Sequence, residues 1–223
     1  MGIPLDAITT LISSLLAVLL GITVHEFSHA LSADWLGDPT ARHMGRLTLN
    51  PIAHLDPVGG LMILVSSISG FGFGWGKPVP VNPVNLRFGP RVGMALTAVA
   101  GPFANIVLAT LVAAPLRLVH SMPLTVYPVL YVVVSTNVAL AVFNLLPIYP
   151  LDGFSVLRGV LATVRARWAY EVSNLLDRMV TFGPMIFMLL IVVDRLIPGR
   201  GIIWTILWPP YQLLMGLILG IRI

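Results

Sequence analysis

Cysteine is absent from this sequence of 223 residues, and charged side chains are scarce. Without cysteine the chain can form no disulfide bond and offers no thiolate ligand to a metal. Asp, Glu, Lys and Arg make up only 10% of the residues, whereas they make up roughly a quarter of an average soluble domain. So few charges cannot cover the surface of a water-soluble globule. Most of the surface must therefore face lipid.

Apolar residues are correspondingly abundant. They make up 57% of the chain, and the mean hydropathy is +0.93. Several apolar stretches reach the ~20 residues that a helix needs to cross the hydrocarbon core of a bilayer. Backbone in lipid must satisfy its own hydrogen bonds, which favours helix. The composition predicts an all-α polytopic membrane protein that forms a single domain over residues 1–223 and has the lipid bilayer as a partner.

The net charge of +4 does not indicate a nucleic-acid-binding surface in such a protein. A few Lys and Arg residues in loops fix the orientation in the membrane, so nucleic acid is not an expected partner. The apolar segments run over about residues 8–35, 58–70, 92–116, 125–146, 179–193 and 202–221. We expect about five transmembrane helices, although Pro209 and Pro210 interrupt the last segment and can stop it from spanning. Region 154–178 is predicted to be interfacial and partly helical.

Segment 58–70 has only 13 residues, which is short for a span and typical of a re-entrant element. Phe71, Phe73 and Trp75 then alternate with glycine at period two, which predicts extended chain and a short β-hairpin-like stretch. The prolines that follow belong at a sheet edge. Two interpretations stay open: an edge that binds substrate backbone around Gly72, Gly74 and Gly76, or a loop that plugs a cavity.

The sequence His25-Glu26-Phe-Ser-His29 has the HExxH pattern. Residues four apart share a helix face, so both imidazoles can bind one metal ion. Glu26 then lies beside the ion and can take a proton from its water. The alternative is a chance match, but three ionisable groups so close together on a hydrophobic helix are costly and need a shared reason.

A catalytic zinc ion usually has three protein ligands. Asp152 is the favoured third ligand because Pro150 and Gly153 flank it at the end of an apolar segment, where a carboxylate can point into a cavity. Its alternative role is to cap the next helix. The other candidates are Asp34, Asp38, His43, His54, Asp56, His120, Glu171, Asp177 and Asp194.

Three motifs occur in order: His25-Glu-Phe-Ser-His29, Gly101-Pro-Phe-Ala-Asn105 and Asn144-Leu-Leu-Pro-Ile-Tyr-Pro-Leu-Asp-Gly153. Over about residues 8–155 the chain resembles the site-2 protease family of intramembrane zinc metalloproteases. Stretch 47–83 resembles its short bacterial and archaeal branch, which lacks PDZ and CBS domains. The resemblance implies one Zn²⁺ bound by His25, His29 and Asp152. It also implies Glu26 as the base, and it places Asn105 and Asn144 near the active site, for transition-state support or substrate binding.

The expected function is therefore hydrolysis of peptide bonds in transmembrane substrate proteins, within or near the bilayer, in regulated intramembrane proteolysis. The core would cover residues 8–155, with accessory membrane segments over 156–223. The alternative is a non-proteolytic zinc protein such as a transporter or sensor, although only one ligand cluster is visible and a transporter needs several along a path. Glu26 separates the two, because only the protease needs it. His54 stays open as an interfacial histidine, a gate or an additional metal contact.

Topology follows from the requirement that His25 and Asp152 meet. Segments 8–35 and 125–146 must then run parallel, which holds only if segment 58–70 dips into the membrane and returns. Charge counting agrees, because this arrangement with an external N-terminus places ten of the 13 basic residues inside. These ten are Arg42, Arg46, Lys77, Arg87, Arg91, Arg158, Arg165, Arg167, Arg178 and Arg222. The active site is thus expected nearer the cytoplasmic face of a prokaryotic cell membrane.

Overall fold

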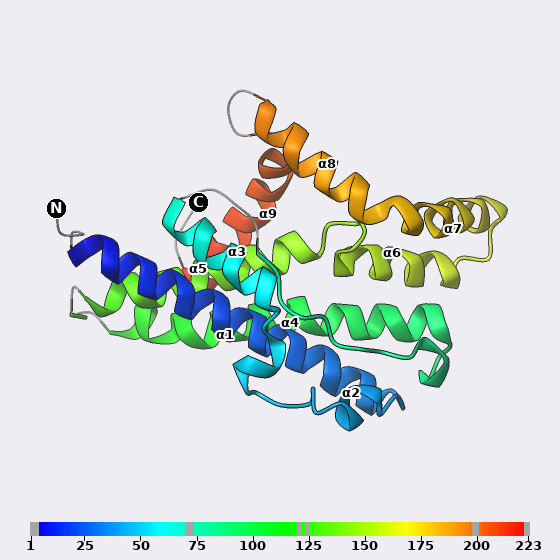
Figure 1. The fold of residues 1–223 in the computed structure, drawn as a ribbon, viewed down its shortest axis with the longest axis horizontal. Helices are drawn as coiled ribbons and strands as arrows, with labels where there is room; N and C mark the ends of the chain where they lie inside the picture. The colour runs from blue at the N-terminus through cyan, green and yellow to red at the C-terminus, as the bar shows by residue number, and fades with distance from the viewer. Residues whose placement is uncertain (1–4, 70–73, 120–121, 124, 198–200, 221–223) are drawn as a thin grey trace.

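The structure is a computed structural model that describes residues 5–69, 74–119, 122–123, 125–197 and 201–220 (Figure 1). These residues form α-helices, short 3₁₀ turns and connecting loops. The helices are α1 (Leu5–Trp35), α2 (Thr40–His43), α3 (Pro57–Ser69), α4 (Pro90–Leu118), α5 (Val126–Asn144), α6 (Asp152–Thr163), α7 (Arg167–Met179), α8 (Gly183–Leu196) and α9 (Ile202–Leu219); the 3₁₀ turns are η1 (Pro51–His54), η2 (Pro83–Asn85) and η3 (Val180–Phe182).

Five helical stretches in the described residues are long and apolar enough to cross a membrane, which confirms the predicted all-α polytopic fold. They are Thr9–Trp35, Pro90–Leu118, Val126–Asn144, Arg167–Asp194 and Ile202–Leu219. The fourth joins α7, η3 and α8, and so it begins twelve residues before the predicted residue 179. The fifth, α9, continues through Pro209 and Pro210 rather than ending there.

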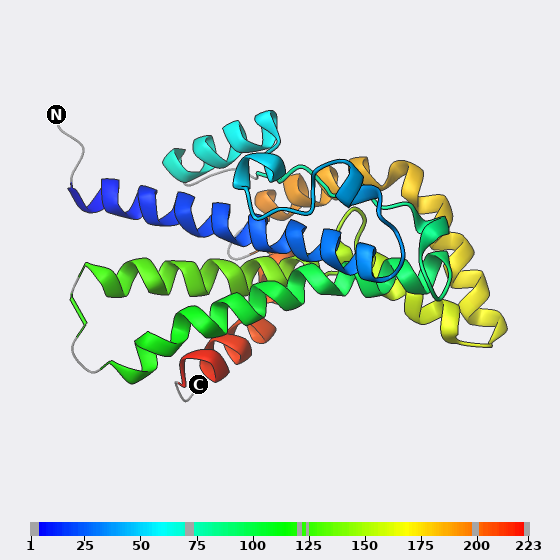
Figure 2. The same ribbon diagram turned by 90° about the horizontal axis from the view of Figure 1, so that it is seen from below.

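Between α1 and α4 the chain makes an excursion and returns (Figure 2). The amide of Arg87, just before α4, donates a 2.7 Å hydrogen bond to the carbonyl of Leu36, just after α1. Within the excursion, the segment after α3 lies against that helix, since a Cβ on Gly59 would be 2.1 Å from the Trp75 carbonyl oxygen. The excursion therefore starts and ends at one end of α1. As a result α4 runs antiparallel to α1, and α5 runs parallel to it, as predicted (Figures 1 and 2).

The predicted hairpin-like stretch is reduced to one contact in the described part of the chain. Leu55 and Gly76 form an isolated antiparallel bridge, and the Lys77 amide donates to the His54 carbonyl at 2.8 Å. From residue 74 to residue 82 the chain has no helix and no further bridge; we call this stretch the 74–82 segment. Phe71, Gly72 and Phe73 lie outside the described residues.

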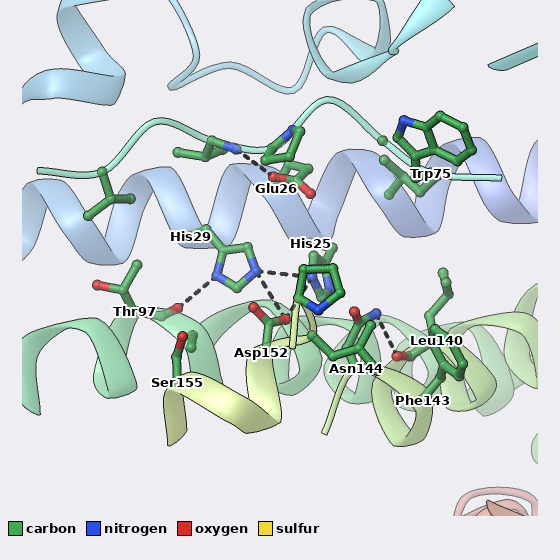
Figure 3. Close-up of a pocket in the computed structure, with 18 of the residues that line it drawn as sticks. His25, Glu26, His29, Trp75, Thr97, Leu140, Phe143, Asn144, Asp152 and Ser155 are labelled. Carbon is green, nitrogen blue, oxygen red and sulfur yellow. Dashed lines mark hydrogen bonds and ion pairs between the residues drawn. The ribbon is translucent and has the colours of Figure 1, made fainter. Parts of the chain in front are cut away.

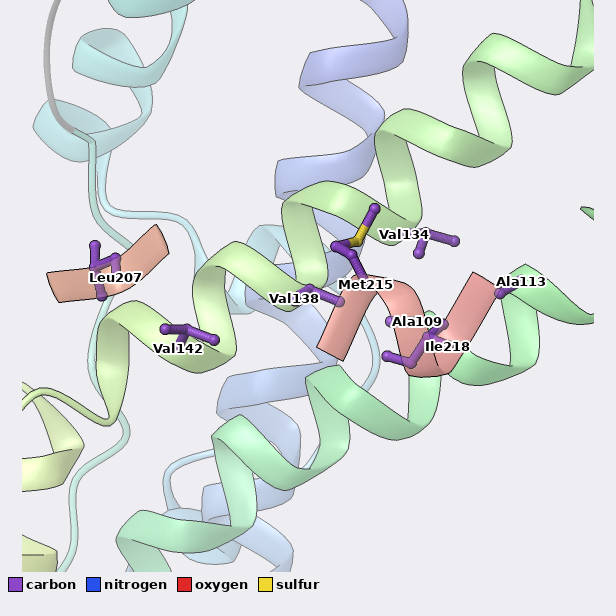
Figure 4. Packing of buried hydrophobic residues seen from close by; sticks show 8 residues of the cluster. All are labelled: Ala109, Ala113, Val134, Val138, Val142, Leu207, Met215 and Ile218. Atoms are coloured by element: carbon purple, nitrogen blue, oxygen red, sulfur yellow. The ribbon is translucent and has the colours of Figure 1, made fainter. Parts of the chain in front are cut away.

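Helices α4, α5 and α9 enclose the main apolar cluster (Figure 4). Ala109 and Ala113 of α4 are fully buried against Val134 and Val138 of α5. Small residues at such positions let helices approach closely, which is how packing stabilises helices in lipid. Leu207, Met215 and Ile218 of α9 complete the cluster. This packing fixes α4 against α5, and both helices contribute to the lining of the site described next.

Candidate metal centre

His25 and His29 lie one turn apart on α1, and both point towards Asp152, the first residue of α6 (Figure 3). Asp152 Oδ2 is 3.1 Å from His25 Nε2 and 3.3 Å from His29 Nε2. The two Nε2 atoms are 3.0 Å apart. Two ligands at 2.0–2.1 Å from a tetrahedral zinc ion are about 3.3 Å apart. The spacing of these three atoms therefore fits a single zinc ion.

Hydrogen bonds on the far side of each imidazole set its tautomer. His25 Nδ1 lies 2.7 Å from Asn105 Oδ1, and His29 Nδ1 lies 2.7 Å from the Thr97 carbonyl oxygen. Both partners are acceptors, so each Nδ1 carries the hydrogen and each Nε2 presents a lone pair. Two lone pairs and a carboxylate oxygen then face one another, and Asp152 Oδ2 has no hydrogen-bond donor among the described residues. A bound cation would satisfy all three of these atoms at once.

The Asp152 carboxyl is held in the ionised form that a metal needs. Burial alone raises its pKa. In the metal-free site with protonated imidazoles, the positive charge of His29 and hydrogen bonds from His25 and His29 lower it by more, so the pKa of Asp152 lies below its ordinary value. The structure thus brings together the three residues that were predicted from the sequence as ligands.

A chain of amides extends from His25 into the helix bundle. Asn105 Nδ2 donates to the Gly21 carbonyl at 3.0 Å and to Asn137 Oδ1 at 2.8 Å. Asn137 Nδ2 in turn donates to the Val133 carbonyl at 2.8 Å. The carbonyl acceptors at Gly21 and Val133 fix the orientation of both amides, so Asn105 Oδ1 must face His25. The amide hydrogens of Asn105 are engaged here, which favours positioning of His25 over support of a transition state; the latter stays a prediction.

Asn137 was not singled out from the sequence, although a signal existed. It is a fully buried amide in the middle of an apolar segment. Polar side chains at membrane depth are expensive and are usually retained for function. Asn144, seven residues after Asn137 on the same helix, was predicted to lie near the site because it is the first residue of a family motif. Asn137 lies outside that motif.

The glycine of the second motif has a steric role. A Cβ at Gly101 would lie 2.5 Å from His29 Nε2 and 2.7 Å from His25 Cε1. Only glycine therefore allows α4 to approach the imidazoles this closely. Asn105 follows four residues later on the same face of α4, where it reaches His25. The motif thus combines close approach with orientation of a ligand.

A cavity of about 500 Å³ adjoins the three ligands, and we call it the metal cavity. Glu26, Asn144 and the 74–82 segment contribute to its lining. Glu26 Oε2 accepts a 3.0 Å hydrogen bond from the Val79 amide. Arg46, which is 6% exposed, donates from Nη2 to the carbonyls of Lys77 and Pro78. Arg46 therefore fixes the segment whose next amide holds the candidate base.

The remaining predicted residues lie at varied distances from this centre. Asn144 lines the metal cavity and donates from Nδ2 to the Leu140 carbonyl at 2.9 Å. Gly74 and Gly76 also line it, and a Cβ at Gly76 would lie 2.6 Å from the Ile22 side chain. Gly72 lies outside the described residues. His54 is fully buried with Nε2 on the Thr48 carbonyl at 2.7 Å, and it is not among the clustered ligand atoms. Its role as a gate or metal contact stays a prediction.

Comparison with known proteins identifies a shared family. The sequence model of peptidase family M50 matches residues 113–191, a range that includes Asp152. "Putative zinc metalloprotease YwhC" of Bacillus subtilis is 34% identical to this chain over 201 residues, which cover 86% of this chain and 84% of that protein. No solved structure matches this chain.

Two mycobacterial proteins named "Putative zinc metalloprotease Rip2" are also similar. The one from Mycolicibacterium smegmatis is 31% identical over 160 residues, which cover 69% of this chain and 59% of that protein. The one from Mycobacterium tuberculosis strain Erdman is 32% identical over 172 residues, with coverages of 74% and 64%. This chain therefore spans less than two thirds of the length of the Rip2 proteins.

Proposed function

The chain belongs to peptidase family M50, the site-2 protease family, and we propose that it is a zinc-dependent intramembrane protease. It would hydrolyse peptide bonds of transmembrane proteins within or near the bilayer, in regulated intramembrane proteolysis. One observation carries the proposal: two imidazole lone pairs and the Asp152 carboxylate converge beside Glu26 at the wall of a cavity. A tight cation site alone would not need an additional carboxylate in the cavity wall.

The residues divide the chemistry among them. His25, His29 and Asp152 would hold one zinc ion per chain, which supplies Lewis acidity at the scissile carbonyl and lowers the pKa of the attacking water. Glu26 would accept the proton of that water and deliver it to the leaving amine. Its Oε2 is held by the Val79 amide, which fixes the position of the carboxylate. Asn105 would keep His25 in the tautomer that binds metal.

The substrate must be unwound, because the peptide bonds of a membrane helix are shielded by its own turns. We propose that the unwound strand pairs with the 74–82 segment. Val79 and Val81 of that segment line the metal cavity. In the described part of the chain the Val81 backbone makes no hydrogen bond, so it can pair with a substrate strand. Pro78 and Pro80 offer no amide, which limits pairing to alternate residues.

Val81→Pro tests this pairing, because it removes one amide without touching the contact between Val79 and Glu26. We expect cleavage to fall about tenfold, the cost of one well-placed hydrogen bond, while zinc content is unchanged. Val81→Ala shortens the same side chain but keeps the amide, and is the matched control. Equal activity of the two variants would show that the segment does not bind substrate through its backbone.

Glu26→Gln tests the proposed function itself. The amide is nearly isosteric but cannot accept a proton, so we expect cleavage to fall at least about a hundredfold. Zinc content should stay near one equivalent per chain in this variant and be lost when His25 and His29 are both replaced by alanine. The readout is the set of membrane-protein fragments released by the native and variant proteins, identified by mass spectrometry.

Three outcomes would count against the proposal. Activity of Glu26→Gln within a few-fold of the native protein removes Glu26 from the mechanism. Stoichiometric zinc in the double histidine variant removes the metal assignment. Zinc transport that persists in Glu26→Gln, without cleavage by either form, would favour a carrier or sensor.

A further inference from the structure

A second cavity of about 220 Å³ adjoins the metal cavity, and we call it the arginine cavity. Its lining consists of Pro83, Pro90, Arg91, Met94, Ser155 and Arg158. Met94 and Ser155 line the metal cavity as well, so the two cavities share a wall. The chain also connects them, because Val81 lines the metal cavity and Pro83 lines the arginine cavity.

Residues of α4 and α6 lead from the metal ligands to the arginines. Asp152, Ser155 and Arg158 occur at every third residue of α6 and lead from one cavity to the other, because Asp152 and Ser155 line the metal cavity and Ser155 and Arg158 line the arginine cavity. Met94 and Arg91 extend the face of α4 that carries Gly101 and Thr97. Six residues of helix rise about 9 Å, and an extended chain covers that distance in about three residues. An extended substrate that lies beside Asp152 thus reaches the arginine cavity about three residues from the scissile bond.

The cavity carries an excess of positive charge. Arg91 and Arg158 share one carboxylate, that of Asp177 on α7, each through a single Nη2 atom. Each guanidinium has five N–H donors, so most of their donors are not used on Asp177. Arg158 Nε is buried without an acceptor among the described residues. Two arginines and one aspartate leave one unit of positive charge and several unused donors in a confined space.

We infer that the arginine cavity binds an acidic side chain of the substrate, about three residues from the scissile bond. The inference rests on the proposed protease function and adds a specificity determinant to it. A carboxylate fits the net charge of one and can accept two parallel hydrogen bonds from a guanidinium. The shared wall with the metal cavity and the path of the 74–82 segment favour a substrate side chain over the phosphate of a lipid headgroup.

The experiment measures one ratio in each enzyme variant. The full-length protein in neutral phosphatidylcholine nanodiscs is given a transmembrane substrate whose cleavage site has been mapped. A single Glu, or Gln as its neutral match, is placed in turn at each position up to five residues on either side of that site. The native protein should cleave the Glu form about tenfold faster than the Gln form in one window near the third residue. This is the lower end for a charge-assisted bond, because both guanidiniums are about a third exposed.

Arg158→Gln and Arg91→Gln should bring the ratio of Glu to Gln cleavage close to one at that window. Arg158→Lys keeps the charge but not the paired donors and should retain part of the preference. Arg165→Gln removes the same charge at an exposed site between α6 and α7 and should leave the ratio unchanged. Because the ratio is taken within one protein, a variant that folds poorly loses both rates and cannot imitate the effect.

Other outcomes distinguish a failure of the acidic subsite from a failure of the protease function. Cleavage by the native protein with equal rates at every position overturns the acidic subsite but leaves the protease function standing. Absence of any Glu26-dependent cleavage overturns both. If the ratio stays at one and phosphatidylglycerol raises the activity of the native protein but not of Arg158→Gln, the cavity binds a lipid phosphate and the inference is wrong.

Discussion

Removal of Asn105 or Asn137 should weaken metal binding through the orientation of His25. Neither residue is a ligand, but Asn105 accepts the hydrogen on His25 Nδ1 and Asn137 accepts from Asn105. We consider Asn105→Leu and Asn137→Leu, since leucine has a similar volume and suits a site surrounded by apolar helix. Without Asn105 no other described residue holds the ring in the tautomer whose Nε2 faces the metal.

The structure sets the relative size of the two effects. Loss of a hydrogen-bonded partner of a ligating histidine typically costs 10- to 100-fold in metal affinity, and we expect this range for Asn105→Leu. In Asn137→Leu, Asn105 still donates to the Gly21 carbonyl. Asn105 loses only one of its hydrogen bonds, the one to Asn137 Oδ1, so the expected loss of zinc affinity is about two- to tenfold. Because Asn137 acts through Asn105, the double variant should bind zinc as weakly as Asn105→Leu alone.

The assay is competition for zinc between the purified protein and a fluorescent chelator, with thermal unfolding of the metal-free protein measured in parallel. Asn144→Leu is the matched control, because among the described residues the Asn144 side chain has one hydrogen bond, to the Leu140 carbonyl of its own helix. It should leave zinc affinity unchanged. Additive losses in the double variant would show that Asn137 does not act through Asn105. A loss of zinc affinity in Asn144→Leu as large as that in Asn137→Leu would show that Asn137→Leu acts through general destabilisation of α5.

Two further predictions concern packing and topology. Gly101→Ala places a methyl group 2.5 Å from His29 Nε2 and should lower zinc affinity about tenfold or more. Gly60→Ala is the control, because its methyl group meets nothing within 4 Å and should leave zinc affinity unchanged. Equal zinc affinities of the two variants in a titration would contradict the close approach of α4 to the imidazoles. Single cysteines that replace Met44, Phe88 and Arg165 should be labelled from the cytoplasmic face, and a cysteine that replaces Pro123 should be labelled from the opposite face. Labelling of positions 44 and 88 from opposite faces would show that α3 spans the membrane.

The parts of the site that follow from local geometry could be predicted from the sequence. His25 and His29 share a helix face because they are four residues apart, and the long apolar runs predict the spanning helices. Asp152 was singled out from its position between a proline and a glycine, and the family motif agreed. The parallel course of α1 and α5 followed from the need for His25 and Asp152 to meet, and the structure has it.

The parts that depend on contacts between distant segments could not be predicted. Nothing near Arg46 in the sequence indicates that its guanidinium holds the carbonyls of Lys77 and Pro78, 31 and 32 residues later. The same is true of Asp177, which binds two arginines from two other helices. The spanning stretch that ends in α8 was also placed too late, because the polar residues of α7 obscure its continuity with the apolar helix that follows.

The cost of burying polar groups in lipid explains why the amides that orient His25 are as precisely hydrogen-bonded as the metal ligands themselves. An amide without a partner at membrane depth costs several kcal/mol, so each buried amide must end in an acceptor. The series from His25 through Asn105 and Asn137 ends at the Val133 carbonyl, and its second branch ends at Gly21. Both ends are backbone carbonyls of spanning helices. The tautomer of the ligand is thus fixed by the packing of α1, α4 and α5.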